Sequence, residues 1–264
     1  MRLLKEFTIF VLKQARAALF AGSFFLLLFI SNHIPLFGLA RYDFLFLAAV
    51  LIQFVMYFTK LETKDELKVI FLFHFIGLVL ELYKTSPAIG SWSYPEAGFL
   101  KIATVPLYSG FMYAAVGSYI SQAWKIFDLH LTNYTRYMWS VVLCALIYIN
   151  FFTNHFIYDF RLFLIAVVFI FFWKVRVYFT VTDKPRWMPL NVGFLLIAFF
   201  VWVAENISTY LGAWKYPDQI HTWTIVSTQK VTSWFLMVII SFILIAYLKH
   251  FKKGLMKSHG RESL

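Results

Sequence analysis

The division of the chain into long apolar stretches is the feature that most constrains its fold. A hydrocarbon core about 30 Å thick is crossed by about 20 predominantly apolar residues in a helix. Eight stretches approach this length when flanking aromatic residues are counted: 15–34, 43–59, 67–83, 103–123, 137–153, 159–176, 188–207 and 225–248. Hydrophobic residues make up 61% of the 264 and charged residues 14%, against about 45–50% and 25% in soluble domains. The sequence therefore predicts an all-α, polytopic membrane bundle of eight transmembrane helices, and a soluble enzyme is excluded.

The placement of lysine and arginine predicts how this bundle is oriented. With eight spans and an inner N-terminus, 18 of the 24 Lys and Arg residues lie in inner segments. Cytoplasmic loops carry an excess of these residues, so both termini are predicted to be cytoplasmic in a bacterial inner (plasma) membrane. The net charge of +11 is explained by this topology, and no nucleic-acid partner is predicted. The lipid bilayer is the expected partner, with the basic tail 250–264 near anionic lipids.

Four landmarks recur in the same order in the two halves of the chain, at offsets between 116 and 124 residues. They pair Ser31-Asn32-His33 with Thr153-Asn154-His155, Tyr42-Asp43-Phe44 with Tyr158-Asp159-Phe160, Glu81 and Thr85 with Glu205 and Thr209, and Gly90-Ser91-Trp92-Ser93-Tyr94-Pro95 with Gly212-Ala213-Trp214-Lys215-Tyr216-Pro217. A four-helix unit has both ends on one side, so two copies are parallel, related by a pseudo-two-fold axis along the membrane normal. We predict a single membrane domain with repeats at about 15–124 and 137–249, whose landmarks converge on one outer vestibule.

Several of these segments resemble a known family. The segments GSWSYPE (90–96), VPLYSGFMY (105–113) and GAWKYPDQ (212–219) are similar to those of the YoaT-like bacterial integral-membrane proteins. That family has no established function, so the resemblance implies a location and no activity. An acidic residue, a G-x-W-x-Y-P loop and a V-P-L helix start also resemble the membrane-bound carotenoid cyclases and hydratases. The cyclases place paired glutamates after the proline, whereas Pro106 is followed by Leu107, Tyr108 and Ser109.

Glu81 is the sharpest single candidate for chemistry. A carboxylate in a spanning helix costs several kcal/mol unless it is paired or protonated. His74 lies seven residues earlier, which places both side chains on one helix face with Gly77 between them. We predict Glu81 as a catalytic general acid and His74 as its proton relay. The alternative is an interhelical hydrogen bond that only fixes packing.

The two G-x-W-x-Y-P loops, 90–95 and 212–217, are here called the lid loops. Their tryptophan and tyrosine side chains are predicted to cap a shared cavity and stack on a ligand. The alternative is anchoring at the membrane interface, which Trp and Tyr favour. The candidate ligand-binding residues are Trp92, Tyr94, Glu96, Glu205, Asn206, Trp214, Tyr216, Asp218 and Lys230.

Lys230 and two aspartates have simpler structural interpretations. Lys230 is predicted to form a salt bridge with Glu81 or Glu205, and a covalent adduct like the Schiff base of rhodopsins is the alternative. Asp43 and Asp159 are predicted to cap helices. No spacing of histidines and carboxylates predicts a metal site.

Three function classes remain open at this point. The first is acid–base chemistry on a lipid or polyprenoid ligand, with Glu81 as the acid and the lid loops stabilising a developing cation. The second is a small-solute or ion-coupled transporter in which the two repeats move around a polar site. The third is a non-catalytic protein that binds a lipid or pigment. No cofactor can be named from the sequence.

Overall fold

The chain is mostly helical in the computed structural model, which describes residues 2–134 and 136–251. The predicted basic tail therefore lies, from residue 252, outside the described residues. Helices of the described chain are α1 (Arg2–Ala17), α2 (Leu19–Ser31), α3 (Arg41–Phe58), α4 (Lys64–Lys84), α5 (Ser109–Ile126), α6 (Tyr137–Thr153), α7 (Arg161–Phe171), α8 (Leu190–Tyr210) and α9 (Lys230–Ala246), with a π-helical turn η2 (Tyr247–Phe251) and a 3-10 turn η1 (Pro217–Gln219). The predicted helical class is confirmed.

Several helices are long and apolar enough to cross a membrane. By length and composition these are α3, α8 and α9 with its extension to Lys249, and a fourth span results if α1 and α2 form one span bent by 70°. Helices α6 and α7 are apolar but shorter. The membrane character of the protein is thus supported by three or four candidate spans, fewer than the eight predicted from the sequence.

Three predicted spans have different boundaries in the structure. The first, 15–34, is preceded by a separate helix, α1. The fourth, 103–123, begins with a short hairpin of β1 (Lys101–Ile102) and β2 (Val105–Pro106), and α5 follows it. Proline has no N–H for a helix interior, so the helix starts only after Pro106.

The sixth predicted span, 159–176, ends early because the chain turns into a sheet. Helix α7 stops at Phe171, and β4 (Arg176–Thr180) pairs with both β3 (His130–Thr132) and β5 (Pro185–Pro189). The order β3-β4-β5 is antiparallel throughout. Four of the five β4 residues, from Val177 to Thr180, are β-branched or aromatic, which suits a strand better than a helix. The all-α prediction therefore omits two small sheets.

Helix packing follows the same scheme in both halves of the chain. In the first half α2 packs on α3, α4 on α5, and α2 on α5. In the second half α6 packs on α7, α8 on α9, and α6 on α9. Helices α5 and α9 contact each other between the halves, and the middle of α9 is almost wholly buried.

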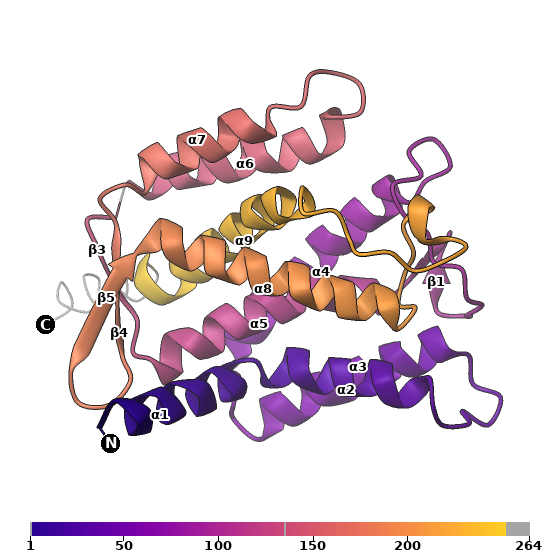
Figure 1. The fold of residues 1–264 in the computed structure, drawn as a ribbon, viewed down its shortest axis with the longest axis horizontal. Helices are drawn as coiled ribbons and strands as arrows, with labels where there is room; N and C mark the ends of the chain where they lie inside the picture. Colours follow the sequence, from indigo (N-terminus) through magenta and orange to yellow (C-terminus); the bar gives the residue numbers. More distant parts are fainter. Residues whose placement is uncertain (1, 135, 252–264) are drawn as a thin grey trace, which may run out of the picture.

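The molecule has two chemically different ends (Figure 1). One end, here called the sheet end, carries β3, β4, β5 and the start of α1. The opposite end, here called the landmark end, carries the interhelical segments 32–40, 85–108, 154–160 and 211–229. These segments include both lid loops, so residues far apart in the sequence meet there.

Candidate functional site

Glu81 lies at the landmark end and is enclosed by aromatic hydrogen-bond donors. Its Oε2 accepts hydrogen bonds from Trp92 Nε1 and Tyr94 OH, each at 2.7 Å. Its Oε1 accepts one from Tyr113 OH at 2.7 Å. With only 2% of the residue exposed, these three donors replace the water that a carboxylate needs. Both oxygens of Glu81 are therefore occupied.

Glu205 is held in a matching way in the second half. Its Oε1 accepts a hydrogen bond from Tyr216 OH, and its Oε2 accepts one from Trp234 Nε1 at 2.8 Å. The residue is 3% exposed. Each carboxylate thus binds the tyrosine of the lid loop that follows it and an aromatic donor from the next helix, α5 or α9. We call Glu81, Glu205, Trp92, Tyr94, Tyr113, Tyr216, Trp234 and Lys230 the carboxylate cluster.

The backbone conformation of the lid loops and one close helix contact position these donors. Gly90 and Gly212 begin the two loops with φ of +58° and +74°, a region that glycine adopts without steric cost. Gly77 of α4 lets the ring of Tyr113 approach, since a Cβ there would lie 2.4 Å from Tyr113 Cδ2. The predicted face of His74, Gly77 and Glu81 is therefore a packing surface for α5.

The two lid loops pair with each other at equivalent positions. Ser93 and Lys215, each three residues after its lid glycine, exchange two backbone N–H to O hydrogen bonds of 2.9 Å. The rings of Trp92 and Tyr216, from different loops, lie 6.1 Å apart with an edge-to-face angle of 75°. Lid residues of both halves therefore form one continuous layer over Glu81 and Glu205.

The contacts of Lys230 differ from those predicted. The expected salt bridge with a glutamate is not formed in the described part of the chain. Instead, Lys230 Nζ lies 4.3 Å from the ring centre of Tyr216 and 5.6 Å from that of Trp92. Both distances fall within the range of cation–π contacts. The ammonium group therefore contacts aromatic faces from both lid loops.

The lid tyrosines remain protonated donors. Burial raises the pKa of Tyr94 well above its ordinary value, and the neighbouring Glu81 raises it further. Burial likewise raises the pKa of Tyr216, followed by the effect of Glu205 and a smaller one of Glu81. Because Glu81 acts on a tyrosine of the other half, the two carboxylates share one electrostatic environment.

His74 is half-buried and lies away from Glu81, deeper in the bundle. Its ring lies 4.5 Å from that of Phe111 and next to Gly110, and its Nδ1 is buried with no hydrogen-bond partner among the described residues. Seven residues of helix separate it from Glu81 by about 10 Å along the axis. The structure does not bring the two side chains into contact.

The remaining candidates serve local structure. Asn206 accepts a hydrogen bond from Val226 N at 2.9 Å and donates one to Trp202 O at 2.8 Å. Trp214 is buried in the core, and Asp218 accepts a hydrogen bond from Thr224 Oγ1 at 3.3 Å. The contacts of Asn206 and Asp218 order the segment between α8 and α9.

The two predicted capping aspartates differ. Asp159 lies one residue before the N-cap of α7, Phe160, and accepts a hydrogen bond from Arg161 N, the first helical N–H, at 2.9 Å. Asp43 makes no cap to α3 and instead binds Phe99 N and Leu100 N at 2.9 and 2.8 Å. Its prediction as a helix cap is wrong, because the aspartate side chain holds the segment between the first lid loop and β1.

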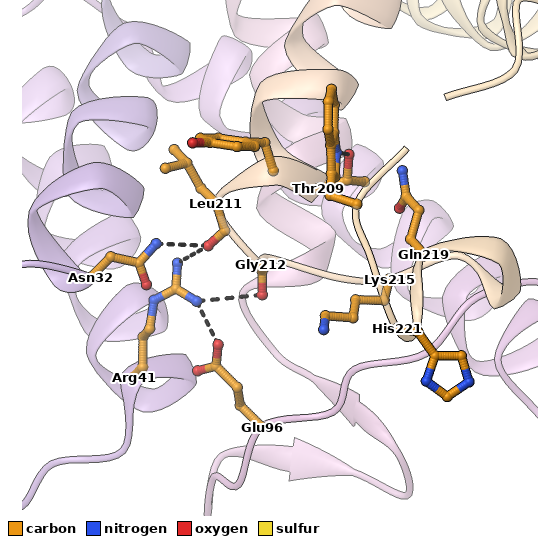
Figure 2. Close-up of a pocket in the computed structure, with 11 residues that line it drawn as sticks. Asn32, Arg41, Glu96, Thr209, Leu211, Gly212, Lys215, Gln219 and His221 are labelled. Carbon is orange, nitrogen blue, oxygen red and sulfur yellow. Dashed lines mark hydrogen bonds and ion pairs between the residues drawn. The ribbon is translucent and has the colours of Figure 1, made fainter. Parts of the chain in front are cut away.

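A polar pocket of about 330 Å³ opens at the landmark end beside the second lid loop (Figure 2). Arg41 donates to Glu96 Oε1 and Leu211 O, both at 2.6 Å, and Lys215 and His221 also line the pocket. Glu96 is among the residues that line this pocket, whereas Glu81 and Glu205 are not. The Arg41 contacts join α3 and the first lid region to the second lid loop.

Comparison with known proteins places the chain in a family. Residues 6–242 match the family described as "Protein of unknown function (DUF817)". The chain belongs to the DUF817 family. It is 50% identical over 253 residues to the uncharacterized protein YoaT of Bacillus subtilis (strain 168), which covers 96% of this chain and 95% of that protein. The predicted resemblance to YoaT-like proteins is confirmed, and no solved structure matches.

This DUF817 protein has a second buried polar group, which the sequence analysis did not select. Near the α3–α4 turn, Glu62 accepts hydrogen bonds from Ser118 Oγ at 2.5 Å and from Gln53 Nε2. Glu66 accepts one from Ser121 Oγ at 2.9 Å. Chiefly because of burial, the pKa of Glu62 is raised. Two lysines neutralise Glu66: Lys125, at 2.9 Å, and Lys249.

Two members of the carboxylate cluster, Tyr113 and Trp234, were not predicted from the sequence. Tyr113 lies 121 residues before Trp234, close to the offset between the two halves. These residues donate to the two glutamates from equivalent helices, α5 and α9. Extending the alignment of the two halves past the lid loops would have identified both residues. The offset between the halves is kept there, although the first half has a tyrosine where the second half has a tryptophan.

Proposed function

We propose that this DUF817 protein crosses the bacterial plasma membrane eight times as two parallel repeats, with both termini in the cytoplasm. Corresponding contacts between the halves support this arrangement. Asn32, at the end of α2, donates to Leu211 O, after α8, at 2.8 Å. Asn154, at the end of α6, accepts from Lys84, at the end of α4, at 3.1 Å. Each repeat thus contacts the other through the same landmark asparagine.

Within this arrangement, the protein acts as a proton-conducting carrier whose outer gate is the carboxylate cluster. The observation that carries this proposal is the contact between Trp92, bound to Glu81, and Tyr216, bound to Glu205. Each glutamate is thus tied to a lid loop, and the two loops are tied to each other. Opening the gate would expose both carboxylates to water and to protons.

Proton coupling has a chemical basis in the hydrogen bonds of Glu81. The carboxylate is stable in the closed gate because three donors surround it. Separation of the lid loops would remove the two donors from Trp92 and Tyr94, so Glu81 would lose two hydrogen bonds that stabilise its charged form at the moment it becomes accessible to protons. Gate opening and proton uptake are therefore linked through the same atoms.

A path for protons between the two ends follows the interface of α4 and α5. Glu62 and Glu66 lie at its inner end and bind Ser118 and Ser121 of α5. Glu81 lies at its outer end and binds Tyr113 of α5. The unpartnered Nδ1 of His74 is between them. Buried ionisable groups along one helix pair are typical of proton relays in membrane proteins.

Acid–base chemistry on a lipid or polyprenoid is a second candidate function. Nδ1 of His74 supports it, because this buried atom has no hydrogen-bond partner in the described part of the chain and an imidazole nitrogen of this kind can give or take a proton. Against Glu81 as the acid, both of its oxygens are already hydrogen-bonded. A substrate would have to displace an aromatic donor before reacting.

Proton movement in proteoliposomes tests the carrier. We expect vesicles with an internal pH dye to acidify when a membrane potential is imposed, and Glu81→Gln or Glu205→Gln to abolish most of this signal. Asp128→Asn, at an exposed position near the sheet end, is the matched control and should conduct normally. Size-exclusion profiles of both glutamine variants would show that they still fold.

Two outcomes would contradict the carrier. One is proton uptake that is absent with the unmodified protein, and the other is uptake that both glutamine variants retain. A changed mass spectrum of bacterial polyprenoid lipids incubated with the protein, lost in His74→Ala, would instead favour chemistry on lipids.

A further inference from the structure

A second pocket, at the sheet end, is lined by cations and tryptophans. It has a volume of about 460 Å³ and lies where α7 leads into β4. The complete lining is Asn133, Trp173, Lys174, Val175, Arg176, Trp187 and Pro189. Two of these residues carry a positive charge, and no carboxylate is among them. An anion is therefore the ligand whose charge fits.

The two cations of this pocket are available for a ligand, unlike Arg186 in the same hairpin and Lys13 in the neighbouring α1. Arg186 binds both carboxylate oxygens of Glu6 at 2.7 Å. Lys13 donates to Thr180 O at 3.0 Å. Within the described chain, by contrast, Lys174 and Arg176 form no ion pair. The contacts of Arg186 and Thr180 anchor the hairpin to α1. Lys174 and Arg176 take no part in this anchoring and can bind a ligand.

One aromatic contact fixes the shape of the pocket. The guanidinium carbon of Arg176 lies 4.2 Å from the ring centre of Trp187. Register places these residues on neighbouring strands, with Arg176 opposite Pro189 and Tyr178 opposite Trp187. Stacking on a ring leaves the N–H groups at the guanidinium edge free to bind oxygen atoms. Arg176 is thus oriented for an oxyanion before any ligand arrives.

The surroundings of the pocket indicate that the anion belongs to a lipid. Trp173 is 75% exposed, and Ile170 and Met138, on the adjoining ends of α7 and α6, are 75% and 69% exposed. Exposed tryptophans next to apolar helix surfaces are typical of the membrane–water interface. A free phosphate would need no such apolar surface, whereas the acyl chains of a lipid would lie along it.

We propose that this sheet-end pocket binds the phosphate headgroup of an anionic phospholipid of the inner leaflet. Lys174 and Arg176 bind the phosphate oxygens, Trp173 and Trp187 lie at headgroup level, and the acyl chains cover the exposed ends of α6 and α7. The site is separate from the carboxylate cluster at the opposite end of the molecule. Only the assignment to the inner leaflet rests on the proposed membrane orientation. Binding of the headgroup itself does not require that the protein transports protons.

Lipid titration of the purified full-length protein in detergent tests this proposal. We expect phosphatidylglycerol to raise the thermal unfolding temperature and to bind in native mass spectra, with phosphatidylcholine far weaker. Lys174→Ala with Arg176→Ala should weaken phosphatidylglycerol binding by about tenfold or more, since each basic residue near a headgroup contributes to the attraction. Trp187→Leu keeps both charges and should weaken binding less.

Lys60→Ala with Lys64→Ala is the matched control, because these exposed lysines lie outside the pocket. The proposal is overturned if this control loses as much affinity as the pocket variant, or if phosphatidylcholine binds equally well. Inorganic phosphate that reproduces the full effect of the lipid would show a free-anion site instead. Proton flux is not measured here, so failure of this test leaves the carrier proposal to its own experiment.

Discussion

At the scale of single residues, the protein places costly charges inside the bundle and surrounds them with aromatic donors. Among the residues that the structure describes, Glu81 and Glu205 receive hydrogen bonds only from tryptophan and tyrosine, whose large rings also bury apolar area. Such donors satisfy a carboxylate without bringing a second charge into the interior. This differs from Glu66, which is neutralised by lysines.

Tyr113→Phe removes a single donor from Glu81. The variant keeps the ring packing but leaves Oε1 of a buried carboxylate unsatisfied, which costs about 1–3 kcal/mol. We expect a lower unfolding temperature in detergent than for Tyr158→Phe, whose phenol is 76% exposed. Equal unfolding temperatures for the two variants would show that Tyr113 OH contributes nothing to stability.

Glu62 provides a pH test, because burial raises the pKa of its carboxyl group. The folded state then holds this proton more tightly than the unfolded state, so stability is highest below the unfolded pKa and falls as pH rises through the folded pKa. Glu62→Gln cannot ionise at this position. As the pH rises from about 4 to about 8, we therefore expect the free energy of unfolding to decrease less for this variant than for the unmodified protein. Parallel unfolding curves across this range, with Asp128→Asn as control, would contradict the assignment.

At the scale of elements, the interface of α4 and α5 determines the geometry of the site. Gly77 accepts the ring of Tyr113, Gly110 lies against His74, and Gly117 lies against Phe73. Small residues let two helices approach closely, as is common in membrane bundles. Close approach is what brings Tyr113 within reach of Glu81.

Gly77→Ala should therefore be far more harmful than an alanine at an open glycine. Its Cβ would lie 2.4, 2.5 and 2.9 Å from three carbon atoms of Tyr113, and overpacking of this kind costs about 1–3 kcal/mol. Gly22→Ala in α2 meets no atom within 4 Å and should be neutral or slightly stabilising. Thermal unfolding of both variants checks this, and similar unfolding temperatures would refute the close contact.

The apolar stretches in the sequence predicted where most helices lie. They did not predict the contacts made at the ends of those helices. The predicted stretch 137–153 coincides with α6, since nothing in it competes with a helix. The stretches 103–123 and 159–176 reached into the β1–β2 hairpin and to the first residue of β4, because apolar content alone does not separate a strand from a helix. Glu81 and Glu205 were selected by the cost of burying charge, whereas the partners of Lys230 depend on tertiary contacts between two distant loops.

At the scale of the whole molecule, the placement of charges and the packing of helices both support the proposed arrangement, in which two parallel repeats have the sheet end on the cytoplasmic side. The landmark end and the sheet end lie at opposite ends of the helices, and most lysines and arginines were assigned to the side that contains the sheet. Each half also repeats the same helix contacts around α5 and α9. The proposed orientation can therefore be tested from either end.

Cysteine labelling of intact cells tests the orientation. In a Cys144→Ser background, Phe37→Cys in the α2–α3 segment should react with a membrane-impermeant maleimide, since this position is 97% exposed at the landmark end. Lys60→Cys in the α3–α4 turn should react only after the membrane is permeabilised. The reverse pattern would place the carboxylate cluster at the cytoplasmic face.

A cross-link between the two lid loops tests whether the halves must separate. Ser93 and Lys215 are a hydrogen-bonded antiparallel pair, whose Cα atoms are about 5.5 Å apart in such geometry, a spacing that a disulfide can bridge. In a Cys144→Ser background, Ser93→Cys with Lys215→Cys should therefore oxidise readily. If the carboxylate cluster is a gate, the oxidised protein loses proton uptake in proteoliposomes and a thiol reductant restores it. Each single cysteine variant controls for the substitution itself, and full activity in a completely cross-linked sample would mean that the lid loops never open.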